Sequence, residues 1–302
     1  SPPGPLAWAP PALSNPTTID VTRSDQSITL DQSRDYVIEL PPYPLVGRGG
    51  LAINGGHNVV LIGGEIDIPW QGASPGPCCN YGRGLFLLNQ TGTVHVEGLY
   101  LHGEDLNEGI DLGQPAGAVV QIENVRIEDI HARDPDPVTG VPSSTHPDLI
   151  QTWGGPRQLL VDRLSGTTEY QGFFLNPNEL YSGPAPELMD FRHVDITGLQ
   201  NSAYLLWKVG DWPLRTTDVW ASPRAGRAAW STFWPNQGAW GDAQMAAHPG
   251  GGFVPQGVAG AGYRTPGYMS AGQASAAVAA RHRLVHRAAR RVHCRPAVKR
   301  RR

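Results

Sequence analysis

The residues best suited to chemistry gather in one string, residues 144–154, which reads STHPDLIQTWG. His146 and Asp148 stand two positions apart at the start of an apolar strand, where a base and a carboxylate could act on one ligand. Another acid, Asp111, and a tyrosine, Tyr170, occupy related positions in neighbouring strands. Groups of these types suit proton transfer, metal binding, or hydrogen bonds to the backbone of the preceding turn.

These strands belong to a two-part unit that recurs along the chain. The first part is a short apolar strand, as in residues 84–87, 109–112, 148–151 and 172–175, and the second is a longer strand, as in residues 96–101, 122–127, 161–164 and 191–196. The longer strands begin 26 to 39 residues apart, whereas one coil of a parallel β-helix needs roughly 20 residues, and the excess falls in polar or Pro- and Gly-rich stretches. The pattern predicts an all-β fold, a right-handed parallel β-helix with irregular caps at both ends.

Composition divides the chain into four expected segments. They are a Pro-rich lead-in or cap at 1–26, the β-helix at 27–223, an irregular Trp- and Gly-rich cap at 224–280 and a basic, disordered tail at 281–302. The tail holds nine Arg and one Lys, so the remaining body is strongly acidic although the net charge of the chain is −3. An acidic body does not favour nucleic acid. No apolar run approaches the roughly 18 residues that span a membrane.

The motif His146-x-Asp148-x-Ile150-Gln151 resembles a signature of pectate-lyase-like β-helix proteins, and the likeness extends over the coils from about residue 50 to 223. Many proteins of that superfamily act on polysaccharides. The resemblance therefore implies a polysaccharide ligand and a secreted or cell-surface protein. It does not point to one particular enzyme.

Aligning the coils assigns faces to the polar residues. If Leu149 stacks on Ile110 and Phe173, Asp111 projects outward, whereas Gln151 points inward as a buried amide. The candidate residues are His146, Asp148, Tyr170, Asp111 and Arg133 for catalysis, Trp153, Lys208, Asn107 and Glu169 for substrate binding, and Glu108, Asp111 and Asp148 for a metal ion.

Two reactions and one non-catalytic role fit these residues. A lyase that cleaves a uronic-acid glycan by β-elimination needs a base, here His146 or Arg133, and a neutralised substrate carboxylate, for which Ca²⁺ would serve. An inverting-type glycoside hydrolase would use Asp111 and Asp148 as its two carboxylates. A non-catalytic carbohydrate-binding or adhesion protein is the third alternative, because a fold does not determine function. We expect the lyase, with Ca²⁺ as cofactor, while the sequence leaves the oligomeric state open.

Two further features could serve the fold instead of binding a ligand. Six of the nine tryptophans lie between 207 and 240, where they could stack on sugars but more simply cover the open end of the coils. Lys208 could bind substrate, yet an ion pair at the end of a coil explains it as well.

Overall fold

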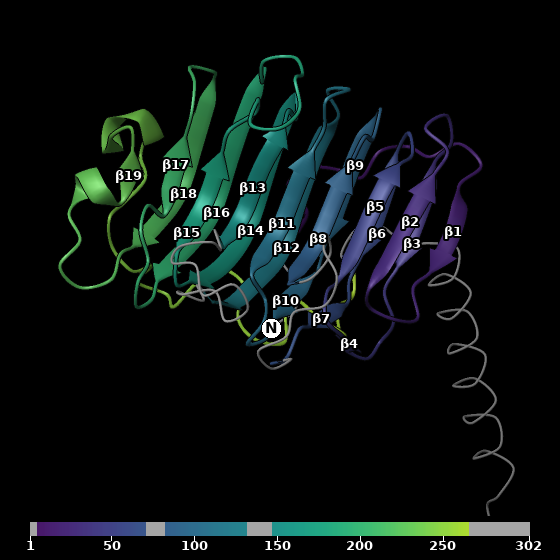
Figure 1. The fold of residues 1–302 in the computed structure, drawn as a ribbon, viewed down its shortest axis with the longest axis horizontal. Coiled ribbons are helices and arrows are strands. Elements are labelled where there is room, and N and C mark those ends of the chain that lie inside the picture. The colour runs from purple at the N-terminus through teal and green to yellow at the C-terminus, as the bar shows by residue number, and fades with distance from the viewer. Residues whose placement is uncertain (1–4, 71–81, 132–146, 266–302) are drawn as a thin grey trace, which may run out of the picture. The chain divides into compact units, whose positions relative to one another are not determined.

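The computed structural model describes residues 5–70, 82–131 and 147–265 (Figure 1). Regular structure in these ranges consists of β-strands and two short 3-10 helices, η1 (Ala229–Ser231) and η2 (Gln237–Trp240). The strand pairs between the described residues are parallel. The all-β fold with parallel sheets that the sequence predicts is therefore confirmed.

One of the two sheets has eight strands. They are β2 (Gln26–Leu30), β5 (Leu51–Gly55), β8 (Arg83–Leu88), β11 (Glu108–Gly113), β13 (Asp148–Gly154), β15 (Gln171–Leu175), β17 (Leu206–Lys208) and β19 (Phe233–Trp234).

The other sheet has eleven strands. They are β1 (Thr17–Asp20), β3 (Tyr36–Glu39), β4 (Leu45–Val46), β6 (Val59–Ile62), β7 (Glu65–Asp67), β9 (Thr93–Glu97), β10 (Tyr100–His102), β12 (Val119–Ile130), β14 (Gln158–Thr168), β16 (Leu188–Gly198) and β18 (Leu214–Ser222).

The chain passes repeatedly from one sheet to the other, and each strand pairs with the equivalent strand of the next passage. Successive arrows therefore lie side by side in chain order in Figure 1. This alternation is consistent with the predicted solenoid.

The longest strands bend at a shared position. The residues with left-handed backbone there are Asn124 of β12, Arg163 of β14, His193 of β16 and Asp218 of β18, with φ of 53°, 55°, 48° and 59°. Gly98, with φ of 74°, takes the same place between β9 and β10, because β12 pairs with β9 before the bend and with β10 after it. Glycine and asparagine adopt this conformation most readily, so the sequence favours a corner at the same point of each coil.

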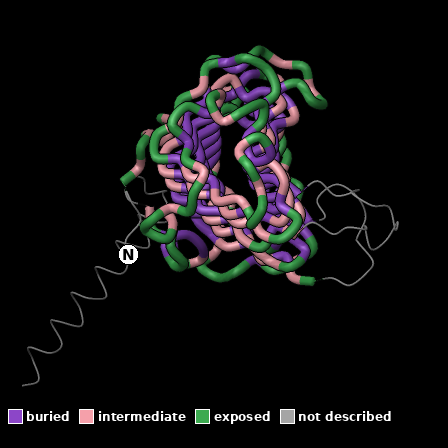
Figure 2. The backbone as a smooth tube through the Cα atoms, turned by 90° about the vertical axis from the view of Figure 1, so that its left-hand side faces the viewer, coloured by how far each residue is buried: buried purple, intermediate pink, exposed green. Residues whose placement is uncertain are grey.

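The core consists of apolar side chains stacked from coil to coil. In the eight-stranded sheet one such column contains Leu51, Leu85, Ile110, Ile150, Phe173, Leu206 and Phe233, all of which are buried. Figure 2 shows the buried parts of the chain gathered along the strands and the exposed parts along the connections. Burial of each such side chain stabilises the fold by about 1.5–3 kcal/mol, so the repeated column is a main source of stability.

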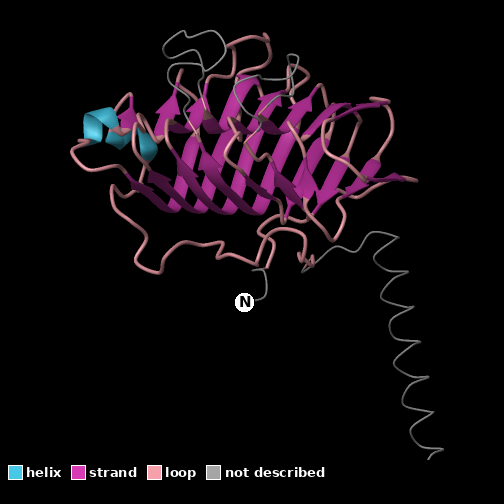
Figure 3. Ribbon diagram, turned by 60° about the horizontal axis from the view of Figure 1, so that its bottom comes forward, coloured by secondary structure: helices cyan, strands magenta, loops and turns pink. Residues whose placement is uncertain are grey.

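Two segments outside the strands cover the eleven-stranded sheet. Near the N-terminus, the backbone amides of Ala7 and Trp8 donate hydrogen bonds to the carboxylate of Glu123 on β12, at 2.6 and 3.1 Å. In the segment that follows β19, the amide of Phe253 donates to Asp195 on β16 at 2.9 Å. In Figure 3, loops run across the strands along one side of the molecule.

Candidate functional site

The outer face of the eight-stranded sheet carries one continuous column of side chains, which we call the outer column. From β2 to β19 it consists of Ser27, Ala52, Phe86, Asp111, Gln151, Phe174, Trp207 and Trp234, paired in register from strand to strand. Alternation along a strand sends neighbouring side chains to opposite faces. Because the residues beside Phe174 and Trp207 are buried in the core, these two rings point outward.

Three successive strands give the outer column an aromatic end. The ring centroids of Phe174 and Trp207 lie 5.2 Å apart, and those of Trp207 and Trp234 lie 5.9 Å apart. Tyr204 contacts both tryptophans, at 4.9 and 5.8 Å. Trp234 is 42% exposed. The rings therefore form a supported aromatic surface that solvent reaches.

The middle of the outer column is acidic. Nε of Arg83 lies 2.6 Å from Oε2 of Glu108 and 2.8 Å from Oδ2 of Asp111. The same guanidinium lies 4.5 Å from the ring centroid of Trp153, and that ring contacts Phe86 at 5.1 Å. Arg83 thus joins two carboxylates to a second aromatic group, which Trp153 and Phe86 form.

Asp148 is the third acid of this centre. Its side chain is 1% exposed, and neither carboxylate oxygen accepts a hydrogen bond within the described parts of the chain. Burial raises the pKa of Asp148, and the charges of Glu108 and Glu179 raise it further. Burial also raises the pKa of Asp111, as does the neighbouring Glu108, while Arg83 opposes the rise. Both acids therefore retain protons to higher pH than ordinary carboxyl groups and are suited to donate them.

The register predicted around Asp148 is wrong by one residue. Ile150, not Leu149, aligns with Ile110 and Phe173, so Asp148 pairs with Gln171. Leu149 and Ile150 are both fully buried, so the alternation of apolar and polar residues does not show which of the two aligns with the core residues of the neighbouring strands.

The inward orientation predicted for Gln151 is also wrong. Gln151 lies between Asp111 and Phe174 in the outer column, and its amide donates to Oε2 of Glu179 at 3.0 Å. The amide is buried and bonded, as expected, but on the outer side of the sheet.

The other predicted residues lie in different surroundings. Lys208 aligns with the buried Leu175, and its ammonium group lies 4.6 Å from the ring centroid of Trp212, so it belongs to the end of the core rather than to the outer face. Glu169 pairs with His131, with 3.3 Å between Oε2 and Nδ1.

Asn107 and Tyr170 immediately precede strands β11 and β15, next to Glu108 and Gln171. The backbone amide of Asn107 donates to the carbonyl of Gly82 at 2.7 Å. His146 and Arg133 lie outside the described residues, and their predicted roles stay predictions.

Sequence reasoning did not identify Arg83, Phe86, Phe174 or Glu179. Phe86 and Phe174 stand in runs of apolar residues, so hydrophobicity alone does not distinguish the outward ring from its inward neighbours. Strict alternation applied to each short strand could have found the two rings, because it places Phe86 and Phe174 on the face opposite to the buried Leu85 and Phe173.

The acidic centre does not fit the predicted Ca²⁺ site. Ca²⁺ takes six to eight oxygen ligands, whereas Glu108 and Asp111 each direct an oxygen to Arg83. Over the ranges that the structure describes, no group of three or more His, Cys, Asp or Glu side chains is arranged to hold a metal ion. A guanidinium occupies the position between the carboxylates, and Ca²⁺ binding stays a prediction from the sequence.

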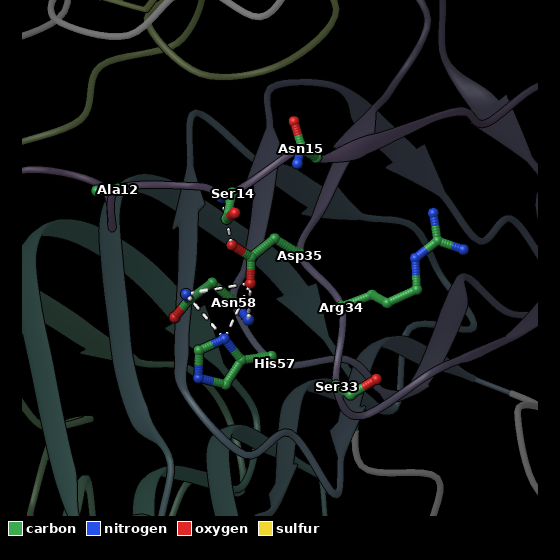
Figure 4. A pocket seen from close by; sticks show the side chains of 8 residues that line it. All are labelled: Ala12, Ser14, Asn15, Ser33, Arg34, Asp35, His57 and Asn58. Carbon is green, nitrogen blue, oxygen red and sulfur yellow. Dashed lines mark hydrogen bonds and ion pairs between the residues drawn. The ribbon is translucent and has the colours of Figure 1, made fainter.

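A separate cavity of about 470 Å³ lies beside the first coils (Figure 4). Its lining residues are Ala12, Ser14, Asn15, Ser33, Arg34, Asp35, His57 and Asn58.

Asp35 is the central group of this cavity. Its carboxylate accepts hydrogen bonds from the backbone amides of Ser14 and Asn58, at 2.6 and 3.1 Å, and contacts Nδ1 of His57 at 2.9 Å. Burial opposes ionisation of Asp35, but these hydrogen bonds outweigh it and lower its pKa. Figure 4 shows the Arg34 side chain pointing away from this group. We interpret the cavity as the junction that fastens the N-terminal segment to the coils.

In comparisons with known proteins, the chain matches no family model, no curated protein and no solved structure. Over the described ranges, no helix is both long and apolar enough to cross a membrane. The function is therefore inferred from the arrangement of the site.

Proposed function

We propose that the chain is a right-handed parallel β-helix that binds a polysaccharide along the outer column of the eight-stranded sheet. The alternation of strands between two parallel sheets supports the β-helix. Crossover connections between parallel strands are right-handed in about 98% of proteins, which supports the hand. A polysaccharide ligand would place the protein outside the cell or at its surface.

The observation that carries this proposal is the series of outward rings Phe174, Trp207 and Trp234 on three successive strands. Aromatic rings offer flat apolar surfaces on which the C–H faces of sugar rings can stack, and tryptophan also supplies an N–H donor. Adjacent strands lie about 4.8 Å apart, so the rings recur regularly across the sheet. A linear glycan would therefore lie across the strands, along the outer column.

A titration of tryptophan fluorescence with a panel of soluble polysaccharides tests this proposal. Trp207→Ala removes the middle ring, and truncating an aromatic anchor of a binding site costs about 2 kcal/mol, which corresponds to more than a tenfold loss of affinity. Trp220→Ala is the matched control, because Trp220 lies on β18 in the eleven-stranded sheet. The proposal predicts weak binding for the first variant and wild-type binding for the second. Equal affinity in both variants would contradict it.

Cleavage of the bound glycan is a second candidate function, favoured by the buried carboxyl group of Asp148, which has no hydrogen-bond partner among the described residues. A protonated Asp148 could donate to the leaving glycosidic oxygen, while the Glu108 carboxylate, held by Arg83, accepts a proton from the attacking water. Asp148 is 1% exposed. The glycan would therefore have to displace the side chains that cover this acid.

Two product assays separate the possible reactions. Hydrolysis produces reducing ends without ultraviolet absorbance, whereas β-elimination, the reaction expected from the sequence, also produces an absorbing unsaturated sugar. Asp148→Asn keeps the size of the side chain and removes the proton donor, so it should abolish hydrolysis and preserve glycan binding. Full hydrolytic activity of Asp148→Asn would exclude this residue as the acid.

A further inference from the structure

We infer that the sugar unit bound over the acidic centre of the outer column carries no negative charge, so that the ligand is an uncharged glycan rather than a polyuronate. This inference rests on the proposed function and names the substrate class of the same site.

The charges around strands β11 and β13 exclude an anionic sugar. Glu108, Asp111 and Asp148 belong to these two strands, and Glu179 reaches the same place through its hydrogen bond from Gln151. Among the described residues of this centre, the cation is Arg83, whose guanidinium is already bound to Glu108 and Asp111. A uronate carboxylate placed here would meet the charges of Glu108 and Glu179, and the described residues of this centre offer it no second cation.

Burial strengthens this exclusion. Asp111 and Asp148 are both 1% exposed, and burial together with the charge of Glu108 raises the pKa of each. The same water-poor environment disfavours a further carboxylate, because like charges repel more strongly there than in bulk solvent. An uncharged sugar avoids this repulsion, because its hydroxyl groups can donate hydrogen bonds to carboxylates. Stacking on Phe174, Trp207 and Trp234 also requires no charge on the sugar.

The cations near the aromatic end do not reverse the conclusion. Arg224 donates to the carbonyl of Ser202 at 3.0 Å, and Arg227 donates to the carbonyl of Ser231. Both arginines follow β18 and precede β19 in the chain, at the far end of the outer column from the acidic centre. They could contact a charge at the end of a ligand, but a homopolymer of uronic acid would still place one carboxylate over Asp111.

The experiment compares oligosaccharides of equal length by calorimetric titration of the full chain. The panel contains uncharged gluco-, xylo- and manno-oligosaccharides, galacturonate oligomers, the same galacturonate oligomers as methyl esters, and cationic glucosamine oligomers. We expect an uncharged member to bind at least tenfold more tightly than the galacturonate oligomers. Esterification neutralises the carboxylate and should therefore remove the loss of affinity that the carboxylate causes. In Glu179→Gln, which removes one charge and keeps the length of the side chain, the discrimination against galacturonate should shrink severalfold.

The outcomes separate the substrate class from the proposed function. Tightest binding of galacturonate or glucosamine oligomers, weakened in both Trp207→Ala and Trp234→Ala, would overturn the uncharged ligand and leave glycan binding at the outer column intact. Binding that neither tryptophan variant weakens, or no binding by any panel member, would overturn both. Tightest binding of an uncharged oligomer, weakened by both variants, supports both.

Discussion

Replacing Glu123 with glutamine should remove a large pH dependence from the stability of the protein. Glu123 is fully buried beneath the N-terminal segment, where its two oxygens accept the amides of Ala7 and Trp8. Burial raises its pKa from 4.5 to about 7, although these two hydrogen bonds and the nearby His95 favour ionisation. The ionisable groups around Glu123 are His95 and Glu97 on β9, Asp162 on β14 and Arg192 on β16.

The sign follows from the raised pKa. The folded chain holds the Glu123 proton more tightly than the unfolded chain, so this group stabilises the fold fully below pH 4.5 and loses that contribution as the pH rises through about 7. A rise of this size corresponds to about 3 kcal/mol. Glutamine cannot ionise, and it keeps a carbonyl oxygen to accept one amide.

Urea unfolding of wild type and Glu123→Gln between pH 4.5 and 8.5 measures the effect. The free energy of unfolding of the wild type should fall relative to the variant by about 3 kcal/mol across this range. Glu187→Gln is the control, because Glu187 forms an exposed pair with Arg157, and such pairs contribute little. A difference between wild type and Glu123→Gln that stays constant with pH, or that favours the wild type at high pH, would refute the reasoning.

Three further expectations follow from the same structure. Gly98→Ala should lower the free energy of unfolding in urea by more than Gly226→Ala does. Both glycines have positive φ, but an added Cβ at Gly98 would lie 2.1 Å from the ring of Tyr263, whereas open space surrounds Gly226. Equal losses of stability in the two variants would rule out this packing argument. Above neutral pH, Asp148→Asn should raise the free energy of unfolding in urea by about 1–3 kcal/mol, because the amide replaces a buried acid that has no hydrogen-bond partner among the described residues; a lower free energy of unfolding would show that the carboxylate is stabilised there. A chelator should leave the melting temperature unchanged, because Arg83 already occupies the space between the carboxylates; a fall that added Ca²⁺ reverses would favour the calcium site expected from the sequence.

The all-β fold with parallel sheets could be predicted because each repeat of the two-strand unit meets the same physical requirement. Apolar residues must recur at one position of every short strand to fill the core, as Leu85, Ile110 and Phe173 do. The register of one coil could not be predicted, because Leu149 and Ile150 are both buried. A Cβ at Gly109 would lie 2.5 Å from the backbone oxygen of Leu149, so only a residue without a side chain fits beside this part of β13.

Part of the candidate site, like part of the fold, could be predicted from the sequence. Stacking parallel strands brings Glu108, Asp111 and Asp148 to adjacent coils, and this proximity follows from the repeat alone. The role of Arg83 did not follow, because a long side chain can choose among several partners and only the coordinates show that it bridges two of these acids. The aromatic end could not be predicted for another reason. Trp207 is one of several tryptophans close together in the sequence, and others of them, such as Trp240, are fully buried in the core.

Oxidative footprinting of the tryptophans, with and without the bound glycan, tests glycan binding at the outer column most directly, because one experiment on the unmodified chain compares both sheets. We expect saturating ligand to lower the oxidation rates of Trp207 and Trp234 severalfold and to leave that of Trp220, on the eleven-stranded sheet, unchanged. Protection of Trp220 with none at Trp207 and Trp234 would contradict it and place the ligand on the other sheet.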